Sequence, residues 1–111
     1  MSVRMTKPWI DLTEENVRRL PGSTGVFQIA DSAGTVVDIG YAGGRSLFGL
    51  RSELAARLAE PGAGAAFRYE VTAQYQSRFH ELVNIAATDD GGLPSGLRER
   101  GVRATGRIRP A

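Results

Sequence analysis

The sequence predicts a small α+β fold in which a three-stranded antiparallel sheet is flanked by helices. A turn-forming tetrapeptide at residues 31–34 joins two runs rich in strand-forming residues, and a link this short cannot make a parallel crossover. Residues 67–75 alternate between apolar and polar side chains, which is the period of a half-buried strand. Leucines recur at spacings of three and four from residue 47 to residue 58, as they do on one buried helical face.

The first half of the chain is predicted to hold a helix and a hairpin. The helix begins with Asp11 or Thr13 as its cap, has acidic residues in its first turn, and ends near residue 20, before a Pro-Gly pair. The hairpin pairs residues 24–30 with residues 34–41, and the second of these runs is rich in β-branched residues.

The second half is predicted to hold a helix, the third strand and a last helix. The first of these helices begins at Ser46 or Gly49, and its buried face consists of Leu47, Leu50, Leu54 and Leu58. The last helix is expected to begin with Ser77 as its cap and to end at an Asp-Asp-Gly-Gly sequence. Its apolar stripe consists of Phe79, Leu82, Val83 and Ala86.

A length of 111 residues suits one domain. We expect residues 1–10 to form an N-terminal lead, residues 11–97 the domain and residues 98–111 a basic tail. Residues 1–8 of the lead are expected to be unstructured, and Trp9 and Ile10 are expected to hold the first helix to a core. From residue 98 to residue 109 there are five arginines and one acid, whereas the remaining residues carry nine basic and eleven acidic groups. Such a tail can contact the phosphates of DNA or RNA, and it can equally be a solvated terminus.

Composition excludes several classes of site and of location. The chain has no cysteine, so it can form neither a disulfide nor a thiolate metal site, and its single histidine, His80, excludes a multi-histidine zinc site. No apolar run approaches the roughly 20 residues that span a bilayer, and the first residues lack the apolar core of a signal peptide. We therefore expect a cytoplasmic protein without a membrane partner.

Two short motifs lie in the predicted hairpin. Gly25-Val26-Phe27 is on the first strand, after a Leu-Pro pair, and Asp38-Ile39-Gly40 is on the second, with ten residues between the triplets. This layout and the order of elements resemble the GIY-YIG nuclease domain, in particular the form found in the nucleotide-excision-repair endonuclease. The resemblance covers about residues 20–87.

The resemblance implies a phosphodiester chemistry whose parts are incomplete here. In that family two tyrosines orient or deprotonate the attacking water, an arginine stabilises the phosphate and a glutamate binds one divalent metal. Phe27 and Asp38 occupy the two tyrosine positions. In a second register, Tyr41-Ala42-Gly43 stands in for the second triplet, and Arg51 then falls at the position of the family's arginine.

Four further residues complete the candidate set of site residues. Glu81 matches the family's metal glutamate, although a solvated helix face also explains it. Gly43, Gly44 and Arg45 follow the second strand and could hold a phosphate through backbone N–H groups and a guanidinium. The same glycines also suit a plain strand-to-helix turn.

The residues therefore leave three functional hypotheses. The leading one is a catalytically degraded GIY-YIG-like domain that needs no cofactor and binds nucleic acid or a protein partner. The second is an active endonuclease that depends on Mg²⁺ or Mn²⁺ and uses Tyr41, Arg51 and Glu81. The third is an accessory subunit of a larger assembly that uses the fold as a scaffold.

Overall fold

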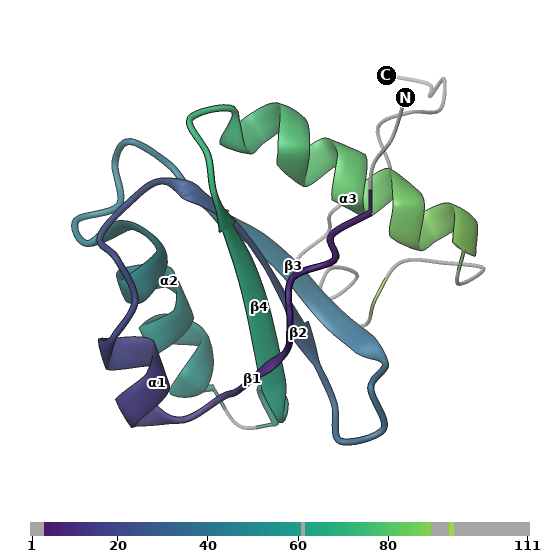
Figure 1. The fold of residues 1–111 in the computed structure, drawn as a ribbon, viewed down its shortest axis with the longest axis horizontal. Coiled ribbons are helices and arrows are strands. Elements are labelled where there is room, and N and C mark those ends of the chain that lie inside the picture. The colour runs from purple at the N-terminus through teal and green to yellow at the C-terminus, as the bar shows by residue number, and fades with distance from the viewer. Residues whose placement is uncertain (1–3, 61, 90–93, 95–111) are drawn as a thin grey trace.

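A four-stranded antiparallel sheet with the strand order β1-β4-β2-β3 forms the centre of the molecule (Figure 1). The computed structural model describes residues 4–60, 62–89 and 94. Its elements are β1 (Ile10–Asp11), α1 (Glu14–Arg18), β2 (Gly25–Ala30), β3 (Val36–Ala42), α2 (Gly49–Leu58), β4 (Ala66–Val71) and α3 (Tyr75–Asp89). Helices α1 and α2 cover one face of the sheet and α3 covers the other, which confirms the α+β class.

The hairpin of β2 and β3 is confirmed close to its predicted bounds. Asp31 closes its turn, because the carboxylate accepts hydrogen bonds from the backbone N–H groups of Ala33 and Thr35 at 2.9 and 3.0 Å. In this register Phe27 lies opposite Gly40. The hairpin therefore places the two signature triplets side by side on adjacent strands.

Both outer glycines of the triplets are sites of close packing. A Cβ atom on Gly40 would lie 2.3 Å from the tip of the Phe27 ring. A Cβ atom on Gly25 would lie 2.1 Å from the carbonyl oxygen of Glu70 on β4. No side chain fits at either position unless its neighbours move.

The fourth strand lies at the end of the predicted N-terminal lead, residues 1–10, and the burial of Met5 corrects the prediction that residues 1–8 are unstructured. Ile10 pairs with Phe67 of β4, and Met5 is 3% exposed in the core beneath α3. Trp9 packs under the guanidinium of Arg68, whose Cζ is 4.2 Å from the ring centroid. A strand of two residues has too little alternation to be recognised in the sequence, and it forms because β4 offers it a free edge.

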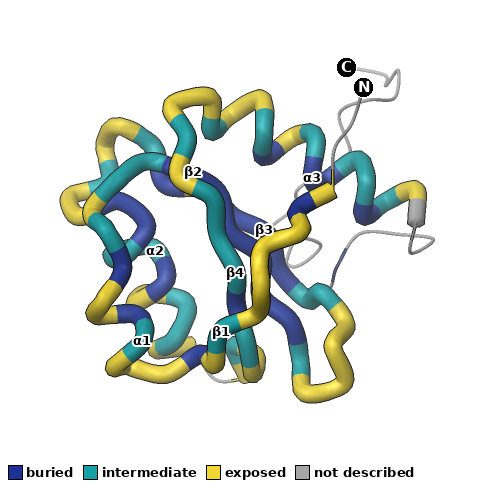
Figure 2. Tube along the Cα trace, viewed as in Figure 1, coloured by how far each residue is buried: buried dark blue, intermediate teal, exposed yellow. Residues whose placement is uncertain are grey.

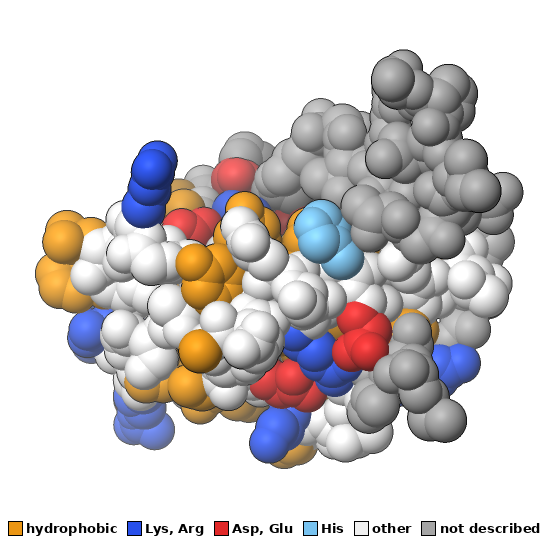
Figure 3. All heavy atoms as spheres, turned by 90° about the horizontal axis from the view of Figure 1, so that it is seen from above, with side chains coloured by type: hydrophobic (Ala, Val, Ile, Leu, Met, Phe, Trp, Pro, Cys, Tyr) orange, Lys and Arg blue, Asp and Glu red, His pale blue; other side chains and the backbone are white. Residues whose placement is uncertain are grey.

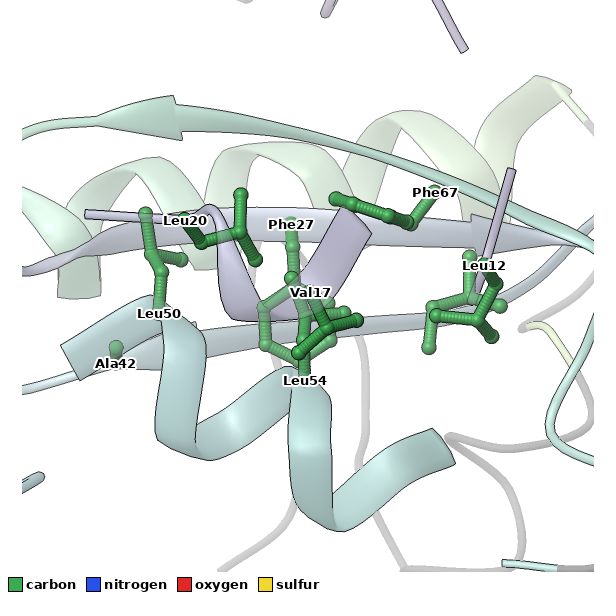
Figure 4. Packing of buried hydrophobic residues seen from close by; sticks show 9 residues of the cluster. Leu12, Val17, Leu20, Phe27, Ala42, Leu50, Leu54 and Phe67 are labelled. Carbon is green, nitrogen blue, oxygen red and sulfur yellow. The ribbon is translucent and has the colours of Figure 1, made fainter. Parts of the chain in front are cut away.

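Two apolar clusters fill the spaces on either side of the sheet. The cluster beneath α1 and α2 consists of Leu12, Val17, Leu20, Phe27, Ile29, Ala42, Leu50, Leu54 and Phe67 (Figure 4). The cluster beneath α3 consists of Met5, Val26, Ile39, Phe79, Leu82, Val83 and Ala86. Strand β2 contributes to both clusters and is buried along its whole length (Figure 2). These positions include the predicted apolar stripe of the last helix.

Of the two predicted starts of α2, Ser46 and Gly49, the structure bears out Gly49, and the predicted buried face is corrected at Leu47. The helix begins at Gly49, whose φ of +55° lets the backbone turn tightly against Ser23. Leu47 precedes this turn and is 81% exposed, and Leu58 is half-buried, so the buried face of the helix consists of Leu50 and Leu54.

Of the predicted caps of α1 and α3, one is confirmed and the other is wrong. Thr13 is the N-cap of α1, because its hydroxyl accepts a hydrogen bond from the N–H of Asn16 at 3.2 Å. Ser77 is not the cap of α3, since the helix already begins at Tyr75.

No helix in the described parts of the chain is long and apolar enough to cross a bilayer. The basic tail, residues 98–111, lies outside the described residues.

Candidate functional site

A cleft of about 680 Å³ lies along β3, the last strand in the sheet order. Residues from β3, from the turn that follows it and from both α2 and α3 line this cleft. Because the two helices cover opposite faces of the sheet, the cleft straddles the sheet edge. We call it the β3 cleft. It gathers four predicted site residues, which are Tyr41, Gly43, Gly44 and Arg45.

Stacked aromatic rings form the α3 side of the β3 cleft. We call the rings of Tyr41, Tyr75 and Phe79 the aromatic wall. Tyr41 lies on the face of the sheet that α3 covers, and its ring stacks on Tyr75 with centroids 5.7 Å apart and planes 12° apart. The centroid of the Phe79 ring lies 5.0 Å from that of Tyr41, and the two ring planes are tilted by 57°. Tyr41 is 39% exposed, so its ring is accessible from the cleft.

The turn that contains Gly43 and Gly44 lines the cleft and also contacts the aromatic wall at Tyr75. The N–H of Gly44 donates a hydrogen bond of 3.2 Å to the hydroxyl of Tyr75. A Cβ atom on Gly43 would lie 3.1 Å from the same ring. One of the backbone N–H groups predicted to bind an anion is therefore used inside the protein. Arg45 is exposed, and it has no ion pair with another described residue.

Arg57, which the sequence analysis did not select, lies on the α2 side of the β3 cleft. Its Nε donates a hydrogen bond of 3.1 Å to Asp38 Oδ2, and its Cζ lies 5.4 Å from the centroid of the Phe27 ring. The side chains of Arg57 and Asp38 are only 16% and 7% exposed. The two residues at the signature tyrosine positions thus hold one guanidinium between them.

A signal for this pair was present in the sequence. Arg57 follows Leu54 by three residues, so it shares the buried face of α2 with the leucines. A buried arginine needs an acidic partner, and Asp38 interrupts a run of β-branched residues in the neighbouring strand.

Arg51 lies on the far side of α2 from the β3 cleft. It lines a second hollow, of about 410 Å³, between α1 and α2. Its Cζ lies 5.3 Å from the centroid of the Phe48 ring, and its Nε is buried without a hydrogen-bond partner.

Glu81 belongs to an ion-pair network on α3 and β4. Its carboxylate pairs with Arg78, whose Nε also donates a hydrogen bond of 2.8 Å to Glu70 Oε1. The hydrogen bond from Arg78 lowers the pKa of Glu70 below its ordinary value, although burial opposes this shift. The bond to Glu70 likewise raises the pKa of Arg78. Tyr41, Arg51 and Glu81 therefore occupy three separate places.

The described residues do not fit a divalent metal at the predicted position. Arg78 already neutralises the carboxylate of Glu81. Within residues 4–60 and 62–89, no three histidine, cysteine or acidic side chains gather closely enough to hold a metal ion. No step through Mg²⁺ or Mn²⁺ is therefore assigned to these residues.

One face of the molecule shows how charged side chains are distributed over the described residues. On the described part of the face seen in Figure 3, basic and acidic side chains are interspersed and hydrophobic side chains gather toward one end. That face therefore carries no continuous basic surface.

Residues 1–89 match a family model described as "Domain of unknown function (DUF7508)". The chain belongs to the DUF7508 family. The match contains every element of the fold and the whole β3 cleft, and it leaves the basic tail outside the DUF7508 region. No curated protein and no solved structure matches the chain.

Proposed function

We propose that this DUF7508 protein is a GIY-YIG-like domain that binds nucleic acid at the β3 cleft without cutting it. The position of Asp38 and Phe27 beneath Arg57 is the observation that carries the proposal. By the resemblance, Phe27 and Asp38 occupy the two tyrosine positions on which the activation of water depends in the GIY-YIG family.

The likeness to a GIY-YIG domain is supported by the arrangement of the motifs. Both triplets lie on adjacent strands of a hairpin, and the order strand, strand, helix, strand, helix follows from β2 to α3. The sheet has helices on both faces, as that fold requires.

The absence of cleavage is supported by the groups at the signature positions. Phe27 has no hydroxyl and is fully buried, so it can neither orient nor deprotonate water. The Asp38 carboxylate accepts hydrogen bonds from Arg57 and from the N–H of Ile39 at 3.1 and 2.9 Å. These contacts engage both carboxylate oxygens, and Asp38 is only 5% exposed, so an attacking water has little access to it.

Nucleic-acid binding is supported by the chemistry that meets in the cleft. The exposed ring of Tyr41 and the half-buried ring of Tyr75 offer a stacking surface for bases, and Arg45 and Arg57 offer positive charge to phosphates. The arginines of residues 98–109 add charge outside the DUF7508 region.

The test combines binding and cleavage by the full-length protein. Labelled single-stranded and duplex DNA and RNA are titrated at about 50 and 200 mM salt, a range over which phosphate contacts lose strength. The same substrates are then incubated with Mg²⁺ or Mn²⁺. We expect salt-sensitive binding that Arg45→Ala weakens, and no cleavage. Arg18→Ala is the matched control, because Arg18 is an exposed arginine on α1 that pairs only at the surface with Glu14.

Other outcomes would favour the other hypotheses. Metal-dependent cleavage that Arg51→Ala or Glu81→Ala abolishes would establish the endonuclease and overturn the proposal. Absence of binding at low salt would remove nucleic acid and leave a protein module, including an accessory subunit of an assembly. The structure offers that module a specific surface, because β3 pairs with β2 on one side only and can accept a strand from a partner.

A further inference from the structure

We propose that the β3 cleft holds one nucleoside phosphate unit, with the phosphate on Arg57 and Arg45 and the base against Tyr41 and Tyr75. This inference rests on the proposed function and specifies the ligand of the same site. The unit can be a free nucleotide or one nucleotide of a single strand, since both present the same phosphate and base.

The contacts of Arg57 hold its guanidinium in a position to bind an anion. Asp38 fixes one edge of the group through Nε, and the Phe27 ring lies against it. Neither Nη nitrogen makes a hydrogen bond to another described residue, although the side chain is only 16% exposed and lines the cleft. A guanidinium held in this way has two donors directed to a ligand and loses little conformational entropy on binding it.

The aromatic wall provides the second half of the site. Tyr75 is held in place by the hydrogen bond from Gly44, and its ring is nearly parallel to that of Tyr41. Fixed, partly exposed rings favour stacking of a base, whatever its identity. The cleft volume of about 680 Å³ falls within the usual range for sites that take small ligands.

Glu53 limits which anions the cleft accepts. Its carboxylate lines the same cleft and accepts a hydrogen bond of 2.9 Å from the hydroxyl of Ser46. It repels phosphate, so the charge on the arginines is partly offset. Inorganic phosphate should therefore bind weakly, and a nucleotide should need both its phosphate and its base.

The experiment titrates the full-length protein by calorimetry with AMP, adenosine and inorganic phosphate. We expect AMP to bind more tightly than the other two probes. Arg57→Gln should weaken AMP binding at least about tenfold, as expected for the loss of hydrogen bonds to a charged group, and leave adenosine binding unchanged. Tyr75→Leu should weaken both AMP and adenosine about fivefold or more. Glu53→Gln should strengthen AMP binding.

The controls separate binding from folding. Arg19→Gln removes an exposed α1 arginine that pairs with Glu15, and it should change nothing. Arg57→Lys keeps the charge without the fork of donors, and it should fall between wild type and Arg57→Gln. If Arg57→Gln unfolds, Glu53→Gln and Tyr75→Leu still test the site. AMP affinity that none of these variants changes would overturn the inference.

Two further titrations separate this inference from the proposed function. Oligonucleotide binding that Arg45→Ala weakens but that neither Arg57→Gln nor excess AMP reduces would leave the proposed function standing and overturn the nucleoside phosphate site. Competition by AMP against a single strand but not against a duplex would identify a nucleotide of a single strand as the natural source. AMP binding with no oligonucleotide binding would identify the free nucleotide and would overturn only the nucleic-acid function.

Discussion

At the scale of single residues, two partly buried arginines organise the polar interior. Arg57 joins α2 to β3 through Asp38, and Arg78 joins α3 to β4 through Glu70. In both pairs the charges are mostly removed from water, so each arginine depends on its acid. The two pairs differ in their use, because Arg57 lines the β3 cleft whereas Arg78 is shared with a second acid, Glu81.

The Arg78 network should make stability depend on acid pH. The folded protein lowers the pKa of Glu70, so this ion pair contributes stability at pH values above the ordinary glutamate pKa of 4.5. That stability is lost as the pH falls through the lowered pKa. Urea unfolding should therefore show a large difference between wild type and Glu70→Gln at pH 7 that shrinks toward pH 3. Glu14→Gln, at an exposed pair, should show a small difference at both pH values, and a constant difference for Glu70→Gln would contradict the assignment.

Placing a tyrosine at position 38 should destabilise the protein. Asp38→Tyr removes the acid that pairs with Arg57 and leaves a mostly buried guanidinium without its partner. Breaking such a pair costs about 3–5 kcal/mol, which thermal or urea unfolding would detect readily. Adding Arg57→Leu to the Asp38→Tyr variant should recover part of the loss. Full stability of the single variant would mean that the guanidinium finds another partner or reaches water.

At the scale of elements, the helix α2 shows how far a periodic pattern can be trusted. Leucine spacing predicted its buried face, and Leu50 and Leu54 are fully buried. The same spacing wrongly included Leu47, because the pattern cannot show that the chain turns at Gly49 before the helix begins. The turn residues and a β-branched run located β2 and β3, and alternation located β4. Neither signal showed β1, whose two residues depend on a long-range partner.

The two leucines that flank this boundary give a matched test. Leu54→Ala should lower the free energy of unfolding by about 2–5 kcal/mol, because it leaves a cavity in the cluster beneath α2. Leu47→Ala removes an 81% exposed side chain and should change that free energy by less than about 0.5 kcal/mol. Equal effects of the two substitutions, measured by urea unfolding, would show that the helix is placed in the wrong phase.

The same limit explains how much of the candidate site could be predicted. The run from residue 41 to residue 45 is continuous in sequence, so its contribution to the cleft was visible as a strand end followed by glycines. Arg57 and Tyr75 come from distant helices on opposite faces of the sheet. Their meeting at the β3 edge depends on strand order, which local patterns do not determine.

At the scale of the whole molecule, the described domain and the C-terminal residues differ in their balance of charge. The described domain contains a cleft with arginines offset by Glu53, whereas residues 98–109 hold five arginines and one acid. The domain is therefore suited to selecting a ligand, and the tail to increasing its attraction for a polyanion.

Deleting residues 98–111 should separate these two contributions. We expect the truncated protein to keep its unfolding midpoint, because the family match ends at residue 89, before the deleted segment. Its affinity for nucleic acid should fall, and the slope of affinity against salt should flatten because fewer counterions are released. Titrations at several salt concentrations measure that slope. An unchanged slope would assign all phosphate contacts to the domain.

The packing at Gly25 and Gly40 bears on how such chains diverge. Each glycine is required by a neighbour that has no chemical role, namely the Glu70 carbonyl and the Phe27 ring. The chemical groups around these glycines can therefore change while the space at each glycine must stay empty. Mutational drift that erases an enzyme's reactive groups would spare these glycines, since the constraint on them is steric. A search keyed to such a motif would then retrieve descendants of an enzyme long after the enzyme's activity has gone.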